Sequence, residues 1–372
     1  MLDRRSFVTV SLGTVSALVL AGCSKGGSDS DVAPAKDGFS SDGAKGKKVI
    51  FLVSGNLGDK GFYDSTAKGI NTLASDYGCE TKIVEMGRDE TTYEATLRDV
   101  SDQDWDLIVC STFSMREVLE GVAPDYPDKS YVLLDVASTV PNILGVSFPG
   151  NEAGFLAGTV AGNYILENFP DNKVAGFIGS MDAQGINDFL VGYIEGVKNV
   201  DESIKVNTSY VGSFEDVATC LEMTTQLYNQ GAEVVYAPAS QSIMGAVTAS
   251  SNTGKALIGC DTDIYSELID SQPDLVQHVL TSSLKRLDEA TIKSATGLWD
   301  GSLKVGTPVN MDVAYGAIGL ADNDNYQKLV SEDTRKKVDE ITQKIASGEI
   351  KPKSAFDMDT EELTKMRDGA KA

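Results

Sequence analysis

The chain has 372 residues, of which 41% are hydrophobic and 23% charged, so it can bury the core of two or three domains or of one two-lobed unit. Its 32 basic and 55 acidic residues give a net charge of −23, which argues against binding to nucleic acid or to anionic lipid through a basic face. The one histidine, His278, disfavours zinc sites and Ser-His-Asp or Cys-His catalysis, and there is no Walker phosphate loop or dinucleotide fingerprint.

Residues 1–22 have the pattern of a lipoprotein signal peptide. Arg4 and Arg5 precede an uncharged apolar stretch that is too short to span a bilayer, and small residues then lead to Cys23. We expect Cys23 to be acylated and to become the mature N-terminus. The paired arginines resemble a twin-arginine export signal, although Asp3 departs from the Ser or Thr that is common before them. The alternative is an ordinary N-terminal anchor helix with a chance cysteine.

Residues 23–46 are rich in Gly, Ser, Asp, Ala and Lys and contain few large apolar residues. Such a segment cannot bury enough surface to order itself, so it is predicted to be a flexible tether with a reach of roughly 25 Å. We therefore expect a globular body that lipid holds at the cell membrane, on its extracytoplasmic face.

The body alternates between strand-like and helix-like segments. A continuous apolar run over residues 49–53 predicts a strand covered on both faces, and a Gly-rich turn then leads into a helical pattern over 62–77. The pattern continues with strands predicted at 81–85, 107–110, 131–135, 174–178, 206–211, 233–237, 256–260 and 279–283, and with helices at 92–100, 114–119, 153–167, 188–199 and 216–229. This alternation predicts parallel βαβ units, and the similarity of the two halves suggests two α/β lobes.

Four cysteines follow Cys23, and their spacing matches no metal-binding motif: Cys79, Cys110, Cys220 and Cys260. An exported protein can form disulfides, but spacing does not determine pairing. We expect the four to be small buried apolar residues instead.

Two phenylalanines occupy equivalent places at the starts of helices in the two halves. Phe62 and Phe189 would both lie beyond the carboxyl ends of parallel strands, where ligands bind in such sheets. Their rings could stack on both faces of a planar ligand, or each could simply fix its own helix to the sheet. Asp59 and Asp188, which precede them, are expected to be helix caps.

Three charged residues follow predicted strands in the same way. Asp261 could accept hydrogen bonds from the neighbouring hydroxyls of a ribose or sugar, or it could belong with Asp263 to a helix cap. Lys285 could donate to a sugar oxygen or could be an ordinary solvated lysine. Asp135 could accept a hydrogen bond from an amino group of a base.

Several segments resemble the basic membrane protein family, the purine nucleoside receptor A-like lipoproteins that bind substrates for ABC importers. Residues 59–65, Asp-Lys-Gly-Phe-Tyr-Asp-Ser, resemble the family segment D-K-S-F-N-x-S, and residues 152–158 resemble E-G-A-F-L-A-G. Further similar segments follow in the expected order at 173–179, 188–196, 210–216, 258–263, 281–285 and 347–350. The resemblance covers nearly all of residues 47–355 and also the lipoprotein cysteine motif.

This resemblance implies a type I periplasmic-binding-protein fold, with two lobes that each contain a mostly parallel sheet flanked by helices and that are joined by a hinge of three crossovers. The predicted N-terminal lobe comprises residues 47–148 and 262–308. The predicted C-terminal lobe comprises 149–261 and 309–355, and residues 356–372 form a C-terminal tail.

The resemblance also implies uptake of a nucleoside, first of all a purine nucleoside, without chemistry and without a cofactor or metal. The residues that it places at the ligand are Ser54, Phe62, Tyr63, Asp135, Phe189, Gly245, Asp261 and Lys285. The rings of Phe62 and Phe189 would stack on the base, and Asp135 would form a hydrogen bond with it. Asp261 and Lys285 would hold the ribose, and Gly245 would allow close approach of the backbone.

Two residues depart from the family pattern near the base. Tyr63 stands where the family has Asn, and Ser54 stands where members often have Asp, so a non-purine ligand stays open. The implied partners are the transporter permease and its ATPase, with no nucleic acid.

Two other functions are compatible with the same residues. The fold could bind a sugar or a signalling molecule, or Asp261 and Asp263 could hydrolyse a nucleoside. A transcription regulator of this fold is disfavoured by the leader, the acidity and the lack of a basic helix-turn-helix segment.

Overall fold

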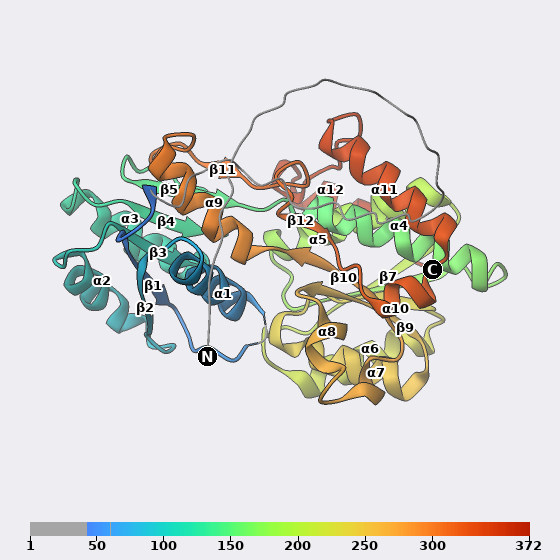
Figure 1. The fold of residues 1–372 in the computed structure, drawn as a ribbon. Coiled ribbons are helices and arrows are strands. Elements are labelled where there is room, and N and C mark those ends of the chain that lie inside the picture. The colour runs from blue at the N-terminus through green and yellow to red at the C-terminus, as the bar shows by residue number, and fades with distance from the viewer. Residues whose placement is uncertain (1–42, 60) are drawn as a thin grey trace, which may run out of the picture. The chain divides into compact units, whose positions relative to one another are not determined.

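The computed structural model describes residues 43–59 and 61–372, which form two α/β lobes with a six-stranded sheet in each (Figure 1). The predicted fold class is confirmed. The predicted signal peptide, Cys23 and most of the predicted tether lie outside the described residues.

The first sheet has the strand order β11-β5-β4-β3-β1-β2, and all its strand pairs are parallel. Its strands are β1 (Lys48–Val53), β2 (Glu80–Glu85), β3 (Leu107–Ser111), β4 (Tyr131–Leu134), β5 (Ile143–Ser147) and β11 (Val309–Asn310). Helices α1 (Phe62–Ser75) and α9 (Leu287–Asp300) cover one face, and α2 (Tyr93–Ser101) and α3 (Arg116–Val122) cover the other. Alternate residues of β1 therefore enter different cores, with Phe51 facing α1 and Leu52 facing α2.

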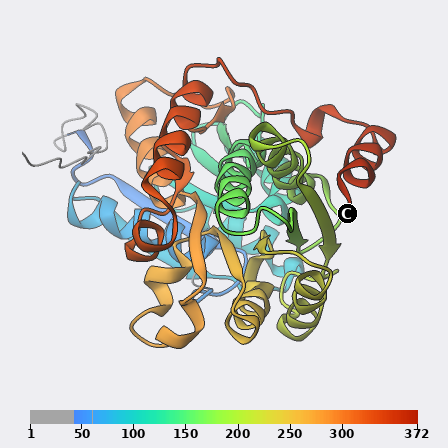
Figure 2. The same ribbon diagram turned by 90° about the vertical axis from the view of Figure 1, so that its right-hand side faces the viewer.

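The second sheet has the order β12-β10-β9-β8-β6-β7, in which only β12 is antiparallel to its neighbour. Its strands are β6 (Val174–Gly179), β7 (Lys205–Tyr210), β8 (Val234–Tyr236), β9 (Ala256–Asp261), β10 (Val279–Lys285) and β12 (Ile318–Leu320). Its helices are α4 (Gly150–Asn168), α5 (Gln184–Val200), α6 (Val217–Asn229), α7 (Ile243–Thr253), α8 (Ile264–Leu268), α10 (Asp324–Leu329), α11 (Glu332–Ala346) and α12 (Thr360–Ala370). In Figure 2, α4 and α5 (green) lie on one side of these strands and α6 and α7 (olive to yellow) on the other.

The chain passes between the two sheets three times: between β5 and α4, between β10 and α9, and between β11 and β12. The second crossing differs from the sequence-based boundary, which assigns residues 262–308 to the first lobe. Because β10 pairs in parallel with β9, it belongs to the second sheet, and the chain crosses back only after Lys285. Strand β11 conversely pairs with β5 in the first sheet.

Helices α4 and α5 pack unusually closely through glycines. A Cβ atom on Gly192 would lie 1.9 Å from the carbonyl oxygen of Asn151, and one on Gly154 would lie 2.2 Å from that of Phe189. The two backbones can approach this closely only because these positions lack side chains. This contact fixes α5, and with it Phe189, against the first turns of α4.

Replacing Gly192 with alanine should lower the free energy of unfolding by about 1–3 kcal/mol or more, because the new methyl group has no space against α4. Thermal or urea unfolding measures the change. Gly185→Ala is the matched control, since it lies in the same helix and a methyl group added there would come within 4 Å of no atom beyond its own turn of helix, so it should be neutral or slightly stabilising. Equal losses in the two variants would contradict this account of the packing.

Glu152, in the first turn of α4, connects two of the segments that cross between the lobes: the one that leads into α4 and the one between β11 and β12. One of its carboxylate oxygens accepts a hydrogen bond of 2.9 Å from the backbone N–H of Val313, which lies between β11 and β12. Burial raises the pKa of Glu152 to about 7 in spite of this bond, and the carboxylates of Asp312 and Asp188 add to the effect. The carboxylate form is therefore costly at neutral pH.

Glu152→Gln should gain stability relative to the wild type as the pH rises. The folded pKa of about 7 lies above the ordinary value of about 4.3, so the native state binds the extra proton and its stability falls between these values. Glutamine keeps an acceptor for Val313 without titrating. Urea unfolding should give a difference that shifts in favour of the variant by up to about 2 kcal/mol between pH 5 and pH 8. A difference that is constant over this range would contradict the assignment.

Candidate functional site

The carboxyl ends of strands in both sheets carry strained backbone. Among residues 43–59 and 61–372, four residues other than glycine have a left-handed φ: Thr112 (74°), Asp135 (71°), Ser240 (52°) and Asp261 (69°). Each lies at the end of β3, β4, β8 or β9 or within four residues of it. This conformation costs roughly 1–2 kcal/mol for a residue with a Cβ atom, and such strain gathers at ligand sites. Both lobes thus present strained backbone where ligands of parallel sheets bind.

Lys285 and Asp135 form an ion pair between the two lobes. Lys285 is the last residue of β10 in the second sheet, and Asp135 directly follows β4 in the first. The Nζ atom donates to Oδ1 of Asp135 over 2.9 Å, and the lysine side chain is only 10% exposed. Two residues singled out from separate parts of the sequence therefore meet between the lobes.

Three phenylalanine rings surround the same ammonium group. The Nζ atom of Lys285 lies 5.8 Å from the ring centroid of Phe62, 5.6 Å from that of Phe148 and 5.7 Å from that of Phe189. Phe62 begins α1 in the first lobe, and Phe189 belongs to α5 in the second. The two aromatic residues predicted to face each other thus flank one point, where cation–π attraction holds the lysine.

The structure also shows what each ring does for the fold. Phe189 is buried and packs edge-to-face against Tyr236, with ring centroids 6.4 Å apart. Phe62 is half-buried and packs in the same way against Tyr63 at 5.8 Å. Phe148 was not predicted, although an aromatic residue directly after an apolar strand is a signal that could have found it.

Burial and charge together set the protonation of the cluster. Burial alone would lower the pKa of the Lys285 ammonium, but the carboxylates of Asp135 and Asp261 outweigh it and raise this pKa above its ordinary value. Burial raises the pKa of Asp261, against the opposing effect of Lys285, and the charge of Asp135 raises it further. The cluster thus offers a cationic donor beside the carboxyl groups of Asp135 and Asp261.

Asp261 and Asp263 have different roles. Asp263 is the N-cap of α8, where its carboxylate accepts hydrogen bonds from the backbone N–H of Ser266 at 3.3 Å and from its hydroxyl at 2.6 Å. It also accepts a bond of 2.6 Å from the side chain of Asn323. The helix-cap alternative therefore holds for Asp263, whereas the charge of Asp261 acts on Lys285.

Ser54 and Tyr63 depart from the family pattern together, and they bond to each other. The hydroxyl of Tyr63 donates to the carbonyl oxygen of Ser54 over 2.9 Å. The hydroxyl of Ser54 donates to the carbonyl oxygen of Ser111 at 3.1 Å and lies 3.0 Å from the side-chain hydroxyl of Thr112. This network links the ends of β1 and β3, and the Tyr63 ring that it holds packs against Phe62.

Gly245 is explained by helix packing. It lies in α7, and a Cβ atom there would come within 2.3 Å of the carbonyl oxygen of Val217 and 2.6 Å of the N atom of Leu221 in α6. The backbone that approaches this glycine so closely belongs to a neighbouring helix, and the approach of a ligand is not needed to account for it.

The two aspartates expected to be caps differ. Asp59 accepts hydrogen bonds from the backbone N–H groups of Gly61, Tyr63 and Asp64, so it caps α1 as predicted. Asp188 does not cap its own helix, since it lies in the second turn of α5. It accepts instead from the N–H of Asn151 in α4, at 2.9 Å, and from the Ser354 hydroxyl and the Ala355 N–H.

The four predicted structural cysteines, Cys79, Cys110, Cys220 and Cys260, are buried free thiols. Within residues 43–59 and 61–372, no three or more His, Cys, Asp or Glu side chains are arranged to hold a metal ion. No helix in the described part of the chain has the length and hydrophobicity needed to cross a bilayer.

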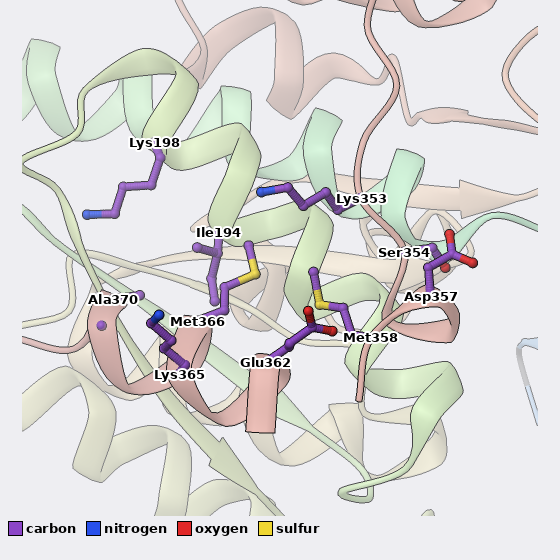
Figure 3. Close-up of a pocket in the computed structure, with 11 residues that line it drawn as sticks. Ile194, Lys198, Lys353, Ser354, Asp357, Met358, Glu362, Lys365, Met366 and Ala370 are labelled. Carbon is purple, nitrogen blue, oxygen red and sulfur yellow. The ribbon is translucent and has the colours of Figure 1, made fainter. Parts of the chain in front are cut away.

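A groove of about 630 Å³ lies elsewhere in the second lobe, between α5 and α12 (Figure 3). Its lining combines apolar residues such as Ile194, Met358 and Met366 with charged residues such as Lys198 and Glu362. None of the residues singled out from the sequence lines it, so the cluster around Lys285 is the better candidate for a ligand site.

Comparison with known proteins supports this architecture. Residues 46–355 match the family described as ABC transporter substrate-binding protein, PnrA-like. Basic membrane protein A of Borreliella burgdorferi is 26% identical over 315 residues, which cover 83% of this chain and 88% of that protein. The ABC transporter nucleoside-binding protein BmpA of Lactococcus lactis is 24% identical over 362 residues, covering 92% and 99% respectively.

Solved structures agree with these matches. An ABC transporter solute-binding protein from Aeropyrum pernix is 26% identical, with a TM-score of 0.73, and the alignment covers 87% of this chain and 99% of that one. A periplasmic ribose ABC transporter protein from Conexibacter woesei shares the fold at a TM-score of 0.58 and 14% identity, covering 77% and 95%.

Proposed function

The chain belongs to the PnrA-like family of ABC transporter substrate-binding proteins, and on that basis we propose that it binds a nucleoside between its two lobes. Proteins of this family are the solute-binding components of transporters rather than enzymes, so a ligand and a transporter are implied. The observation that carries the proposal is the convergence of Phe62 and Phe189, from opposite lobes, on the Lys285 ammonium group.

A nucleoside fits the chemistry of this cluster. A flat base can stack on aromatic rings, and each stacked base contributes about 1–3 kcal/mol. Carboxylates such as Asp135 and Asp261 accept from amino and hydroxyl groups, and the Lys285 ammonium donates to ribose oxygens. The L. lactis relative, which is named a nucleoside-binding protein, supports the same ligand class. We take a purine nucleoside as the first candidate, with the corner formed by Ser54 and Tyr63 as the place that would decide between bases.

We propose further that acylated Cys23 anchors the protein on the extracytoplasmic face of the cell membrane, where it would deliver its ligand to a permease and its ATPase. The basis is the sequence of the leader. Mass spectrometry of the mature N-terminal peptide tests this: a diacylglyceryl group on Cys23 is expected, and an unmodified Cys23 inside a longer chain would contradict it.

The hydrolase alternative finds less support. It needs Asp261 and Asp263 to act together, but Asp263 is engaged as a helix cap and by Asn323. Release of free base and ribose from a nucleoside on prolonged incubation with the protein would revive it.

Thermal unfolding with a panel of ligands tests the ligand class. Purine and pyrimidine nucleosides, free bases, ribose and other sugars are each added at rising concentration. A nucleoside that binds the native state should raise the melting temperature in proportion to RT ln(1 + [L]/Kd). No stabilisation by any nucleoside or base would overturn the proposal, and stabilisation by sugars alone would favour the sugar-binding alternative.

Phe62→Ala should weaken binding of the nucleoside found in this way by about five- to 150-fold, the equivalent of about 1–3 kcal/mol, because one stacking face is lost. Phe62 is a better test than buried Phe189, whose loss would disturb the fold. Isothermal titration calorimetry measures the affinity. Phe356→Ala removes a ring that is 60% exposed and outside the cluster, so it should bind like the wild type. If the two variants bind equally well, Phe62 serves only to fix α1.

A further inference from the structure

The three crossings between the lobes lie at one end of the two strand orders. Strands β5 and β11 end the first sheet, and β10 and β12 end the second, whereas β2 and β7 form the opposite edges. When two lobes rotate about such crossings, the loops that follow the opposite edges move farthest apart. When the two lobes move apart, contacts between those loops must therefore break.

An arginine of the first lobe makes one contact of this kind and a second contact with a loop nearer the middle of the second sheet. Arg88 follows β2, and its guanidinium pairs with the carboxylate of Glu215, which lies between β7 and α6. It also donates to the side-chain oxygen of Gln241, after β8, over 3.4 Å. The Arg88 and Glu215 side chains are 52% and 50% exposed, so salt in the solvent can screen the pair.

Two exposed aromatic rings meet across the same opening. Phe113 follows β3 in the first lobe, and Phe214 precedes α6 in the second. Their centroids are 6.4 Å apart at an interplanar angle of 37°, although the residues are 69% and 37% exposed. Rings with this much exposure contribute little to the core of either lobe, so their main contact is the one that joins the lobes.

We propose that these residues form a cleft clasp: Arg88 and Phe113 from the first lobe with Phe214, Glu215 and Gln241 from the second. The clasp sets how long the lobes stay together around a ligand. This inference rests on the proposed function, in which the ligand binds between the lobes. Arg88 is then a positioning residue, because it alters affinity through closure and not through contact with the cluster around Lys285.

The size of the effect follows from the equilibrium between open and closed lobes. An observed dissociation constant rises in proportion as the binding-competent fraction falls. An exposed ion pair is a weak contact, so its loss should raise the dissociation constant by up to about fivefold, and loss of the aromatic pair should raise it by about two- to tenfold, in both cases mainly through faster ligand release. The Arg88 effect should shrink in 1 M salt, whereas that of Phe113 should persist.

The first test needs no ligand. Small-angle X-ray scattering of the full chain compares the radius of gyration of Arg88→Glu, Glu215→Arg and the double variant that exchanges the two charges. Each single variant places like charges opposite each other and should be larger than the wild type, and the exchanged pair should return to its size. Arg98→Glu is the matched control, since Arg98 pairs with Glu94 and Asp125 inside the first lobe.

The second test measures dissociation of the stabilising nucleoside by stopped flow. Arg88→Glu and Phe113→Ser should release it faster than the wild type, the exchanged pair should restore the rate, and Phe356→Ser should not change it. The clasp is refuted if Arg88→Glu behaves like Arg98→Glu in scattering, or if the exchanged pair stays as expanded as the single variants. Failure of every nucleoside to bind refutes the proposed function alone, because scattering still decides the clasp.

Discussion

The site depends on the ion pair between the buried ammonium group of Lys285 and the carboxylate of Asp135. Lys285 is the last residue of a strand in one lobe, and Asp135 follows a strand in the other. Three aromatic rings surround the ammonium group. A buried charge is tolerated only while its partners are in place, because removing one partner leaves the other uncompensated. The same groups therefore hold the two lobes together. A ligand that binds between them must supply polar groups to replace the contacts that it displaces.

The rest of the fold holds the residues of this cluster in place. Glycines let α4 and α5 approach closely, and this packing fixes Phe189. Tyr63, which bonds to Ser54, packs against Phe62, and Asp135 and Asp261 lie at strand ends where the backbone is strained. Stability is thus given up locally at the strand ends and supplied by the parallel sheets and their helix layers.

Much of this architecture follows from the sequence because buried parallel strands leave continuous apolar runs. Phe62 and Phe189 both follow such runs, but they are not equivalent as predicted: Phe62 begins α1, whereas Phe189 lies in the second turn of α5. Strand pairing is different, because an apolar run does not indicate which strand lies beside it. The predicted lobe boundary at residue 262 therefore places β10 in the first lobe, whereas β10 pairs with β9 in the second. The role of Gly245 depends on α6, which is a non-local contact. Phe148 and the residues of the cleft clasp lie in loops or single 3-10 turns, which are too short for periodicity to be informative.

A crystal structure of the protein with its stabilising nucleoside would show whether the ligand lies at Lys285. We expect the base between the rings of Phe62 and Phe189, with its sugar within hydrogen-bonding distance of Asp261 and Lys285. A nucleoside held elsewhere, such as in the groove between α5 and α12, with the Lys285 ammonium still enclosed by the three rings, would contradict this expectation.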